Sequence, residues 1–437
     1  MNHRMRYLAA GVLSLLFLGL IYSWSNFSAP IGQEYGWDRE SMRLVFTVSI
    51  IGFCAGGLLG ARLNKKLSFK PALLIAGALL VGGFASTALL IDAGGLLLLY
   101  VSYGVLCGGG CGIAYNVIIS TVNAWFPDRI GFSSGALMMG FGLGGLILGT
   151  AAAAGIDMVG WKAVFLVLAT LIALVIGVTA LVIKPKGRAQ AASAKASAME
   201  RPPATRVDRR EGGSVKVIAG ESASAARSPL FWIYCIWATC ALCAGLIIIG
   251  DAKPAALAVG LEAGFATLLV GLVSTTNGLA RIVIGMVYDR FGLRLVVAIS
   301  SLSALAGALA LALSFAPGMQ VPLLFVAGAL LVGFSYGCIP VISSAFTLGQ
   351  YGPGRYPENL ALANFTMAPA AVLSSLAAAS ARDVGGAANG DFAVYVVVAV
   401  IALLALGVFV VFARRLGREE SGRAAGDAFE ASKRREG

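Results

Sequence analysis

Long apolar runs separated by short polar stretches make up most of this chain of 437 residues. A helix needs about 20 apolar residues to cross the hydrocarbon core of a bilayer. Twelve runs reach that length, so the pattern predicts an all-α integral membrane protein that lies in a lipid bilayer. The predicted spans are residues 8–28, 43–61, 71–91, 96–122, 132–155, 162–183, 229–250, 264–288, 294–315, 321–346, 359–379 and 391–413.

The first span follows a basic stretch, MNHRMRY, as the apolar core of a signal peptide would. It ends in bulky residues, SLLFLGLIYSWSNF, without a small-residue cleavage site, and further spans follow. We therefore expect a retained membrane helix.

Composition supports a membrane location, because 12% charged residues is about half of the roughly 25% typical of soluble domains. Basic residues gather in alternate loops, at Arg4, Arg6, Arg62, Lys65, Lys66, Lys70, Arg414, Arg415 and Arg418, and ten of them lie in residues 184–228. The other loops carry Glu34, Asp38, Glu40, Asp92, Asp157 and Glu262. Since Lys and Arg favour cytoplasmic loops, both termini should be cytoplasmic, as in a bacterial inner-membrane protein. This topology accounts for the net charge of +12 and removes the need for a nucleic-acid partner.

Residues 184–228 lack periodic apolar positions and are rich in Ala, Ser, Arg and Pro, which predicts a flexible cytoplasmic linker. The linker divides a six-helix half, 1–183, from a second, 229–413, and a disordered cytoplasmic tail, 414–437, follows. The halves repeat each other, because GARLNKKLSFK after the second span recurs 225 residues later as GMVYDRFGLRL. Two parallel six-helix repeats with a binding site between them are a plan used by transporters.

The loop motif Gly285–Asp289–Arg290–Gly292–Arg294 resembles that of the major facilitator superfamily. The first copy departs from the motif, with Asn64 in place of the usual Asp and Leu67 in place of Gly. Four stretches resemble the branch of oxalate–formate antiporters and monocarboxylate transporters: GLIYSWSNF, YGWDRESMRLVFTVSI, GIAYNVIISTVNAWFPDR with the GFSSG that follows it, and TTNGLARIVIGMVYDRFG. The resemblance implies twelve helices in two pseudo-symmetric halves and transport by alternating access.

Arg281 lies inside the eighth span, eight residues before Asp289. That spacing is about 12 Å along a helix, close to the middle of the membrane. An arginine there costs about 2.5–3.5 kcal/mol to insert and is usually functional. Asn277 and Ser274 share its helix face, and the planar guanidinium can hold a carboxylate by two parallel hydrogen bonds. The alternative is a packing arginine whose donors are taken by backbone carbonyls.

Other polar residues at membrane depth are candidates for the same site. Tyr115 and Asn116 lie in the fourth span and Tyr336 in the tenth, and a tyrosine hydroxyl can donate to a carboxylate. For these residues, and for Asn277, helix packing is an equally good interpretation. Asp289 and Arg290 are expected to form part of a cytoplasmic gate. Weaker candidates are Tyr22, Trp24, Asn26 and Asn364.

The resemblance also bears on the substrate. It implies that Arg281 binds the anion, and that oxalate-specific members carry a second cation, a lysine, where this chain has Met367. One buried cation balances one carboxylate, so small monocarboxylates such as lactate, pyruvate or formate are expected. A dicarboxylate exchanger is the alternative. Proton-coupled relatives carry an acid at the position of Asn277, so symport with protons, uniport and exchange all stay open.

Other functional classes fit less well. GFGLGG at 140–145 matches dinucleotide-binding spacing but follows no strand, which favours helix packing. His3 is the only histidine, and all seven cysteines fall within spans, so no metal site, cofactor or catalytic triad is expected, and the chain should not be an enzyme. An exporter of cationic drugs would need a buried acid. A membrane sensor would need a signalling region, which the linker and tail do not resemble.

Overall fold

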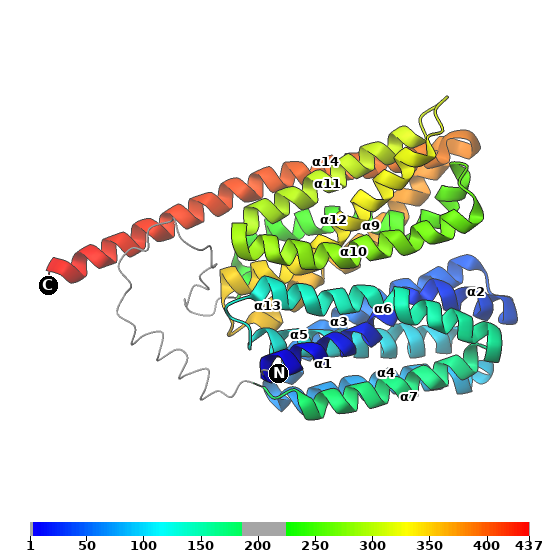
Figure 1. The fold of residues 1–437 in the computed structure, drawn as a ribbon, viewed down its shortest axis with the longest axis horizontal. Coiled ribbons are helices and arrows are strands. Elements are labelled where there is room, and N and C mark those ends of the chain that lie inside the picture. The colour runs from blue at the N-terminus through cyan, green and yellow to red at the C-terminus, as the bar shows by residue number, and fades with distance from the viewer. Residues whose placement is uncertain (1–2, 186–223, 437) are drawn as a thin grey trace.

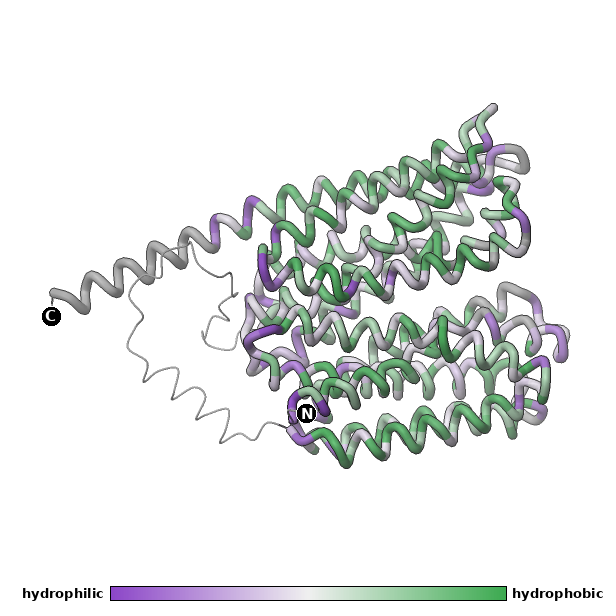
Figure 2. The backbone as a smooth tube through the Cα atoms, viewed as in Figure 1, coloured by the Kyte–Doolittle hydropathy of each residue, from purple (hydrophilic) through white to green (hydrophobic). Residues whose placement is uncertain are grey.

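The computed structural model describes residues 3–185 and 224–436. Within this part of the chain, twelve helices are long and apolar enough to cross a membrane, which confirms the predicted number of spans. Most of the predicted linker, 184–228, lies outside the described residues. Hydropathy along the backbone is high in the middle of the helices and low at their ends (Figure 2).

The helices form two groups that lie side by side (Figure 1). The first group contains α1 (His3–Leu18), η1 (Gly19–Ser23), α2 (Trp24–Tyr35), α3 (Arg39–Leu67), α4 (Phe69–Leu99), η2 (Tyr100–Cys107), α5 (Gly108–Asn123), α6 (Ile130–Val159) and α7 (Trp161–Val182). The second contains η3 (Ala225–Arg227), α9 (Pro229–Ala258), α10 (Ala263–Phe291), α11 (Leu293–Ser314), α12 (Pro322–Tyr351), α13 (Tyr356–Asn364) and α14 (Met367–Glu436). We call these groups the N-half and the C-half.

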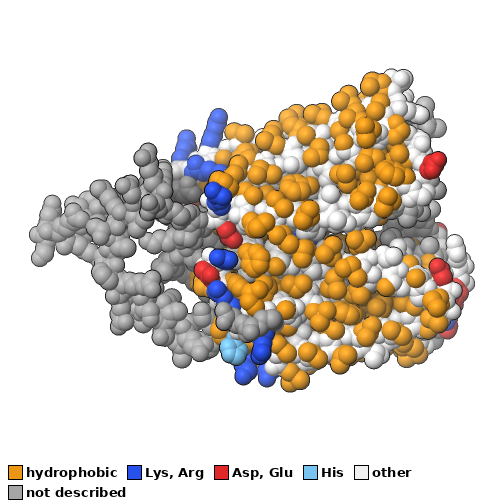
Figure 3. Space-filling model, viewed as in Figure 1, with side chains coloured by type: hydrophobic (Ala, Val, Ile, Leu, Met, Phe, Trp, Pro, Cys, Tyr) orange, Lys and Arg blue, Asp and Glu red, His pale blue; other side chains and the backbone are white. Residues whose placement is uncertain are grey.

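One end of the bundle, which holds Arg4, Lys65 and Arg290, is called the basic end here. The other, which holds Glu34 and Asp92, is called the opposite end. The face shown in Figure 3 has most of its Lys and Arg side chains, with a few acidic ones among them, on the side of the chain termini, then a wide hydrophobic band, and acidic side chains at the far side. This separation follows the alternation of basic and acidic loops in the sequence.

Local sequence signals explain where the helices begin and turn. The Asp38 side chain accepts a hydrogen bond from the backbone N–H of Ser41 at 3.2 Å and caps the start of α3. Helix α14 contains both the second part of the eleventh span and the twelfth span, which meet at Gly386. Gly386 has φ of +62°, a conformation that costs little only for glycine.

Residues 414–436 depart from the sequence-based expectation of a disordered tail. They continue α14 to Glu436, and the helix projects beyond the other helices (Figure 1). The stretch is rich in Ala, Glu, Arg and Lys, which have high helix propensity, and has no proline to end the helix.

Glycines allow helices to approach closely inside and between the halves. A Cβ atom on Gly140 would lie 2.6 Å from the Val12 carbonyl oxygen of α1, so this part of GFGLGG serves helix packing. Between the halves, Gly131 of α6 and Gly285 of α10 face each other, and a Cβ on either would collide with the backbone of the other. The contact between α6 and α10 brings α6 next to Arg281.

Candidate functional site

Arg281 lies on α10 between the two halves and is only 1% exposed. Its Nε and Nη2 donate to the Asn277 side-chain oxygen at 3.2 and 3.1 Å, and its Nη1 donates to the backbone carbonyl of Met138 on α6. These partners are neutral, and none of the acidic residues described in the structure forms an ion pair with it. The result is a buried, uncompensated positive charge at the interface of the halves.

The hydrogen bonds of Arg281 bear on both interpretations of this residue. A bond to a backbone carbonyl is what a packing arginine would form. However, a guanidinium has five N–H donors, and the three bonds leave one donor on each terminal nitrogen. Two donors on adjacent nitrogens match the two oxygens of a carboxylate. The arrangement therefore suits anion binding as well as packing.

The sequence suggests Asn277 as a substrate-binding residue, but its immediate partner in the structure is Arg281. Its oxygen binds Arg281 one helical turn away, so in this structure it orients the guanidinium. Because the amide oxygen accepts hydrogen bonds from both Nε and Nη2, it fixes the plane of the guanidinium. Asn277 is 9% exposed and is therefore buried together with Arg281.

Three tyrosines surround the cation. Tyr115 of α5, Tyr336 of α12 and Tyr22 of η1 all lie within electrostatic range of Arg281. The Tyr336 hydroxyl is buried without a hydrogen-bond partner among the described residues, and it faces that of Tyr22 without a bond of normal geometry. An orphaned buried hydroxyl costs about 1–3 kcal/mol, so it is available to a ligand. Tyr22, a weaker candidate from the sequence, belongs to this group by position.

The lining around the tyrosines is aromatic and apolar. Phe141 contacts the rings of Tyr22 and Tyr115, with centroids 5.4 and 5.0 Å away. The Tyr22 hydroxyl lies 3.8 Å from the sulfur of Met367, at the start of α14. Met367 is 7% exposed and therefore lies buried next to the tyrosine cluster. The site thus has one cation, several hydroxyls and apolar walls.

Asn116 and the remaining weak candidates do not join this group. Asn116 follows Tyr115, but its amide donates to the Pro357 carbonyl at 2.9 Å, in the first turn of α13. Trp24 and Asn26 donate to the backbone carbonyls of Met42 and Gly149, within the N-half. Asn364 contributes its carbonyl, which lies 3.6 Å from the sulfur of Cys54.

Asp289 connects the halves at the basic end. Its carboxylate accepts hydrogen bonds from the backbone N–H groups of Gly131 and Phe132 at 2.9 and 3.0 Å. These donors lie in the first turn of α6, where unpaired N–H groups and the helix dipole favour a negative charge. Arg290 is exposed, and its guanidinium carbon lies 5.3 Å from the centroid of the Phe291 ring. Asp289 therefore makes the contact between the halves, and Arg290 faces outward.

A second group of contacts, missed by sequence reasoning, closes the same end. Asn123 at the end of α5 donates to Ser134 at 2.7 Å and to the Tyr356 hydroxyl at 3.0 Å. Ser344 of α12 bonds to both Ser134 and Tyr356. Four buried polar side chains from both halves thus form one network. Polar residues near the ends of spans were the only sequence signal, because the partners lie far apart in the chain.

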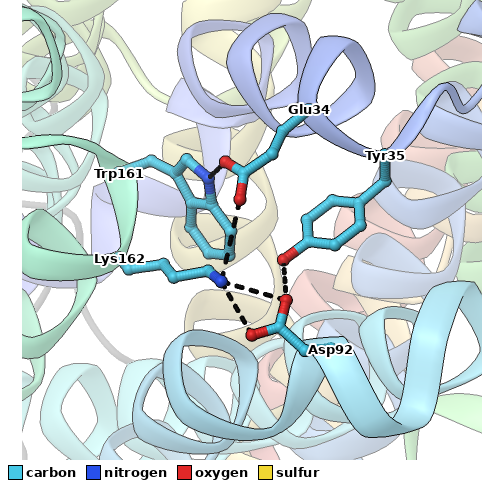
Figure 4. A network of polar contacts seen from close by, with 5 residues as sticks. All are labelled: Glu34, Tyr35, Asp92, Trp161 and Lys162. Atoms are coloured by element: carbon cyan, nitrogen blue, oxygen red, sulfur yellow. Dashed lines mark hydrogen bonds and ion pairs between the residues drawn. The ribbon is translucent and has the colours of Figure 1, made fainter.

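The opposite end has a polar network within the N-half alone (Figure 4). Lys162 of α7 lies 2.9 Å from the Asp92 carboxylate at the end of the third span and 3.7 Å from Glu34 of α2. Trp161 also donates to Glu34, and Tyr35 donates to Asp92. This network joins the outer ends of three spans. The hydrogen bonds between the halves that are named above lie at the basic end or near Arg281.

Neutralising Asp289 should loosen the basic end. In Asp289→Asn the negative charge at the α6 N-terminus is lost, and an amide can accept with only one oxygen, a cost of about 1 kcal/mol or roughly fivefold in the closed population. Spin labels at the exposed positions of Arg129 and Arg290 would report the separation of the halves by double electron–electron resonance spectroscopy. We expect longer distances in Asp289→Asn and no change in Asp128→Asn, whose carboxylate pairs with Arg4 inside the N-half. Unchanged distances in Asp289→Asn would exclude a gate role.

Known proteins resemble this chain in sequence. A relative from Oxalobacter formigenes, the oxalate:formate antiporter, is 25% identical over 67% of this chain and 65% of its own length. The chain therefore spans just under two thirds of that relative. A transporter of Escherichia coli described as uncharacterized, YhjX, is 24% identical over 80% of this chain and 81% of its own. Rat monocarboxylate transporter 12 is 30% identical over 33% of this chain and 28% of its own.

Solved structures share the fold at low sequence identity. The proton:xylose symporter XylE superposes with a TM-score of 0.70, at 14% identity, over 92% of this chain and 94% of its own. FucP in its outward conformation gives a TM-score of 0.63, at 16% identity, over 92% and 99%. The sequence profile of the Major Facilitator Superfamily matches residues 9–252, more than half of the chain. The chain is therefore an integral membrane transporter, not an enzyme, and belongs to the Major Facilitator Superfamily.

Proposed function

We propose that this protein moves small monocarboxylates, of the lactate, pyruvate or formate type, across the membrane by alternating access. The observation that carries the proposal is Arg281, a buried cation between the halves with two donors left on its terminal nitrogens. A charge at this depth needs a counter-ion, and no described acid supplies one. A bound carboxylate would supply it, with the Tyr22, Tyr115 and Tyr336 hydroxyls nearby.

The direction of access follows from charge and from the gate. We place the basic end in the cytoplasm because Lys and Arg favour that side, which puts both termini there, as expected for a bacterial inner membrane. Asp289 and the Asn123 network join the halves at this end, whereas the polar network described at the opposite end lies within the N-half. In this conformation the site would face outward. Rocking of the halves about Arg281 would then expose the site to the cytoplasm.

Uptake assays test the proposal. Purified protein in proteoliposomes would be given labelled lactate, pyruvate, formate and oxalate, with and without a pH gradient. Monocarboxylate uptake is expected, and the gradient distinguishes proton symport from uniport, while preloading with unlabelled acid reveals exchange. Failure to transport any of these acids would exclude the proposal.

A dicarboxylate exchanger is the second candidate, and the oxalate:formate antiporter among the relatives favours it. The charge of the site argues against it, since a second carboxylate would be left without a cation in a low-dielectric environment. Strong competition by oxalate against labelled lactate in the unaltered protein would favour the dicarboxylate exchanger over the monocarboxylate transporter.

Adding a second cation should shift the preference. Met367→Lys would place an amine beside Tyr22, which lies within electrostatic range of Arg281. We expect oxalate to compete better, and lactate uptake to fall, because the extra buried charge has no partner in the monocarboxylate complex. Inhibition of lactate uptake by oxalate is the measurement, and Met367→Leu separates charge from shape. If Met367→Lys and Met367→Leu respond alike to oxalate, the charge argument fails.

A further inference from the structure

The two sides of the gate differ, although the halves repeat each other. On one side, Asp289 of α10 binds the first turn of α6. The equivalent residue 225 positions earlier is Asn64, which donates to Ser120 at 3.4 Å inside the N-half. The neighbouring Lys65 pairs with Glu358 of α13 at 3.2 Å, but this ion pair is largely exposed and therefore weak. Asp289 of α10 thus caps the first turn of α6. Among the described contacts, α3 provides no equivalent cap for the first turn of α13.

The short helix α13 nevertheless carries several contacts to the N-half. Its first three residues, Tyr356, Pro357 and Glu358, all contact that half. A two-residue step at Phe365–Thr366 separates α13 from α14. Within the C-half, the Tyr356 hydroxyl bonds to Ser344 of α12, which supports the first residue of α13. A second support from the C-half follows Glu358.

Asn359, the next residue, provides this support. It is 1% exposed, and its side-chain oxygen accepts a hydrogen bond at 3.0 Å from the backbone N–H of Ala225. Ala225 belongs to η3, at the end of the segment that joins the halves, and is fully buried. Trp232 of α9 donates to the carbonyl of Ala226 at 2.9 Å, which fixes η3 to the C-half.

The N-terminal end of the joining segment, where the structure describes it, also contacts a residue beside the gate. The carbonyl of Lys184 accepts a hydrogen bond at 3.0 Å from the indole N–H of Trp125, in the loop between α5 and α6. Asn123 of the gate network lies two residues before Trp125. Both described ends of the segment are therefore fastened beside gate residues, one in each half.

We propose that η3 is a brace for the gate: it holds α13 against the N-half through the Ala225–Asn359 hydrogen bond, on the side where the repeat lacks its capping acid. Asn359 is then a positioning residue for α13. Opening of the basic end requires the first turn of α13 to leave the N-half. The brace does not depend on which substrate is carried.

Hydrogen exchange of the full-length protein in nanodiscs tests the brace without any substrate. Asn359→Ala removes the acceptor and Ala225→Pro removes the donor. Proline fits at Ala225 because Ser224, with φ of −75° and ψ of 119°, has the extended backbone that precedes proline. We expect amides of residues 356–364 to exchange about tenfold faster in either variant, as for the loss of one buried hydrogen bond of about 1.4 kcal/mol. The double variant should show no further increase.

Two comparisons decide the result. Amides of residues 131–137, held by Asp289, should keep their rates, and Asn64→Ala should change neither region. Unaltered exchange at 356–364, additive effects in the double variant, or equal acceleration at 131–137 would overturn the proposal. If Ala225→Pro fails to fold, the exchange rates of Asn359→Ala and Asn64→Ala can still be compared. This comparison tests the proposal, because only Asn359→Ala removes the hydrogen bond to η3.

Discussion

Replacing Arg281 with lysine is expected to abolish most substrate uptake while the protein still inserts in the membrane. Lysine keeps the positive charge, so the insertion cost is similar. A single ammonium cannot reproduce the planar fork that bonds Asn277 and Met138 and still offers two donors. Loss of one charge-assisted, two-point contact corresponds to about 2–3 kcal/mol, or roughly a 30- to 150-fold fall in uptake. Initial rates in proteoliposomes at matched protein content are the measurement.

Arg62→Lys is the matched control, since Arg62 is exposed on α3, away from the interface described above. It should transport like the unaltered protein. Full uptake by Arg281→Lys would remove Arg281 from the binding site and leave it as a packing residue.

The second large effect is expected from Asn277→Asp. The amide oxygen lies 3.1 and 3.2 Å from two guanidinium nitrogens, so a carboxylate there would pair with Arg281 directly. The site would lose its net positive charge, and an anion would then bring an uncompensated negative charge into the low-dielectric interior. We expect uptake at neutral pH to fall at least about tenfold, with partial recovery as pH falls, because protonation of the new carboxylate frees the cation.

Uptake from pH 5 to 8 distinguishes this charge effect from a loss of shape. Asn277→Ala removes the oxygen without adding charge, so its lower uptake should depend on pH like that of the unaltered protein. Thermal unfolding should show that Asn277→Asp is at least as stable as Asn277→Ala, since it pairs a buried charge. Neutral-pH uptake by Asn277→Asp equal to that of the unaltered protein would contradict a charge-limited site.

The sequence predicts the spans and the depth of Arg281 because both follow from simple lengths. Apolar runs of about 20 residues must be helices in lipid, and Arg281 lies eight residues before Asp289, near the end of its helix. The family resemblance adds the two-half architecture. These features depend on local composition and on a repeated motif, which a single sequence displays directly.

The directions of single side chains could not be predicted in the same way. Tyr115 and Asn116 are neighbours on one helix, about 100° apart, and only tertiary contacts decide that one lies near Arg281 and the other reaches Pro357. At a spacing of four residues, Asn277 could equally serve the substrate or Arg281. The Asn123 network joins residues up to 233 positions apart, and short polar side chains near helix ends are too common to identify it.

Equilibrium binding tests the central claim most directly. Labelled lactate or pyruvate would be titrated onto the purified protein and onto Arg281→Lys in detergent, where no transport step contributes. The account predicts one bound monocarboxylate per chain in the unaltered protein, displaced only weakly by oxalate, and no measurable binding in Arg281→Lys. Equal binding by both proteins would contradict it, because the carboxylate would then be held without the buried guanidinium.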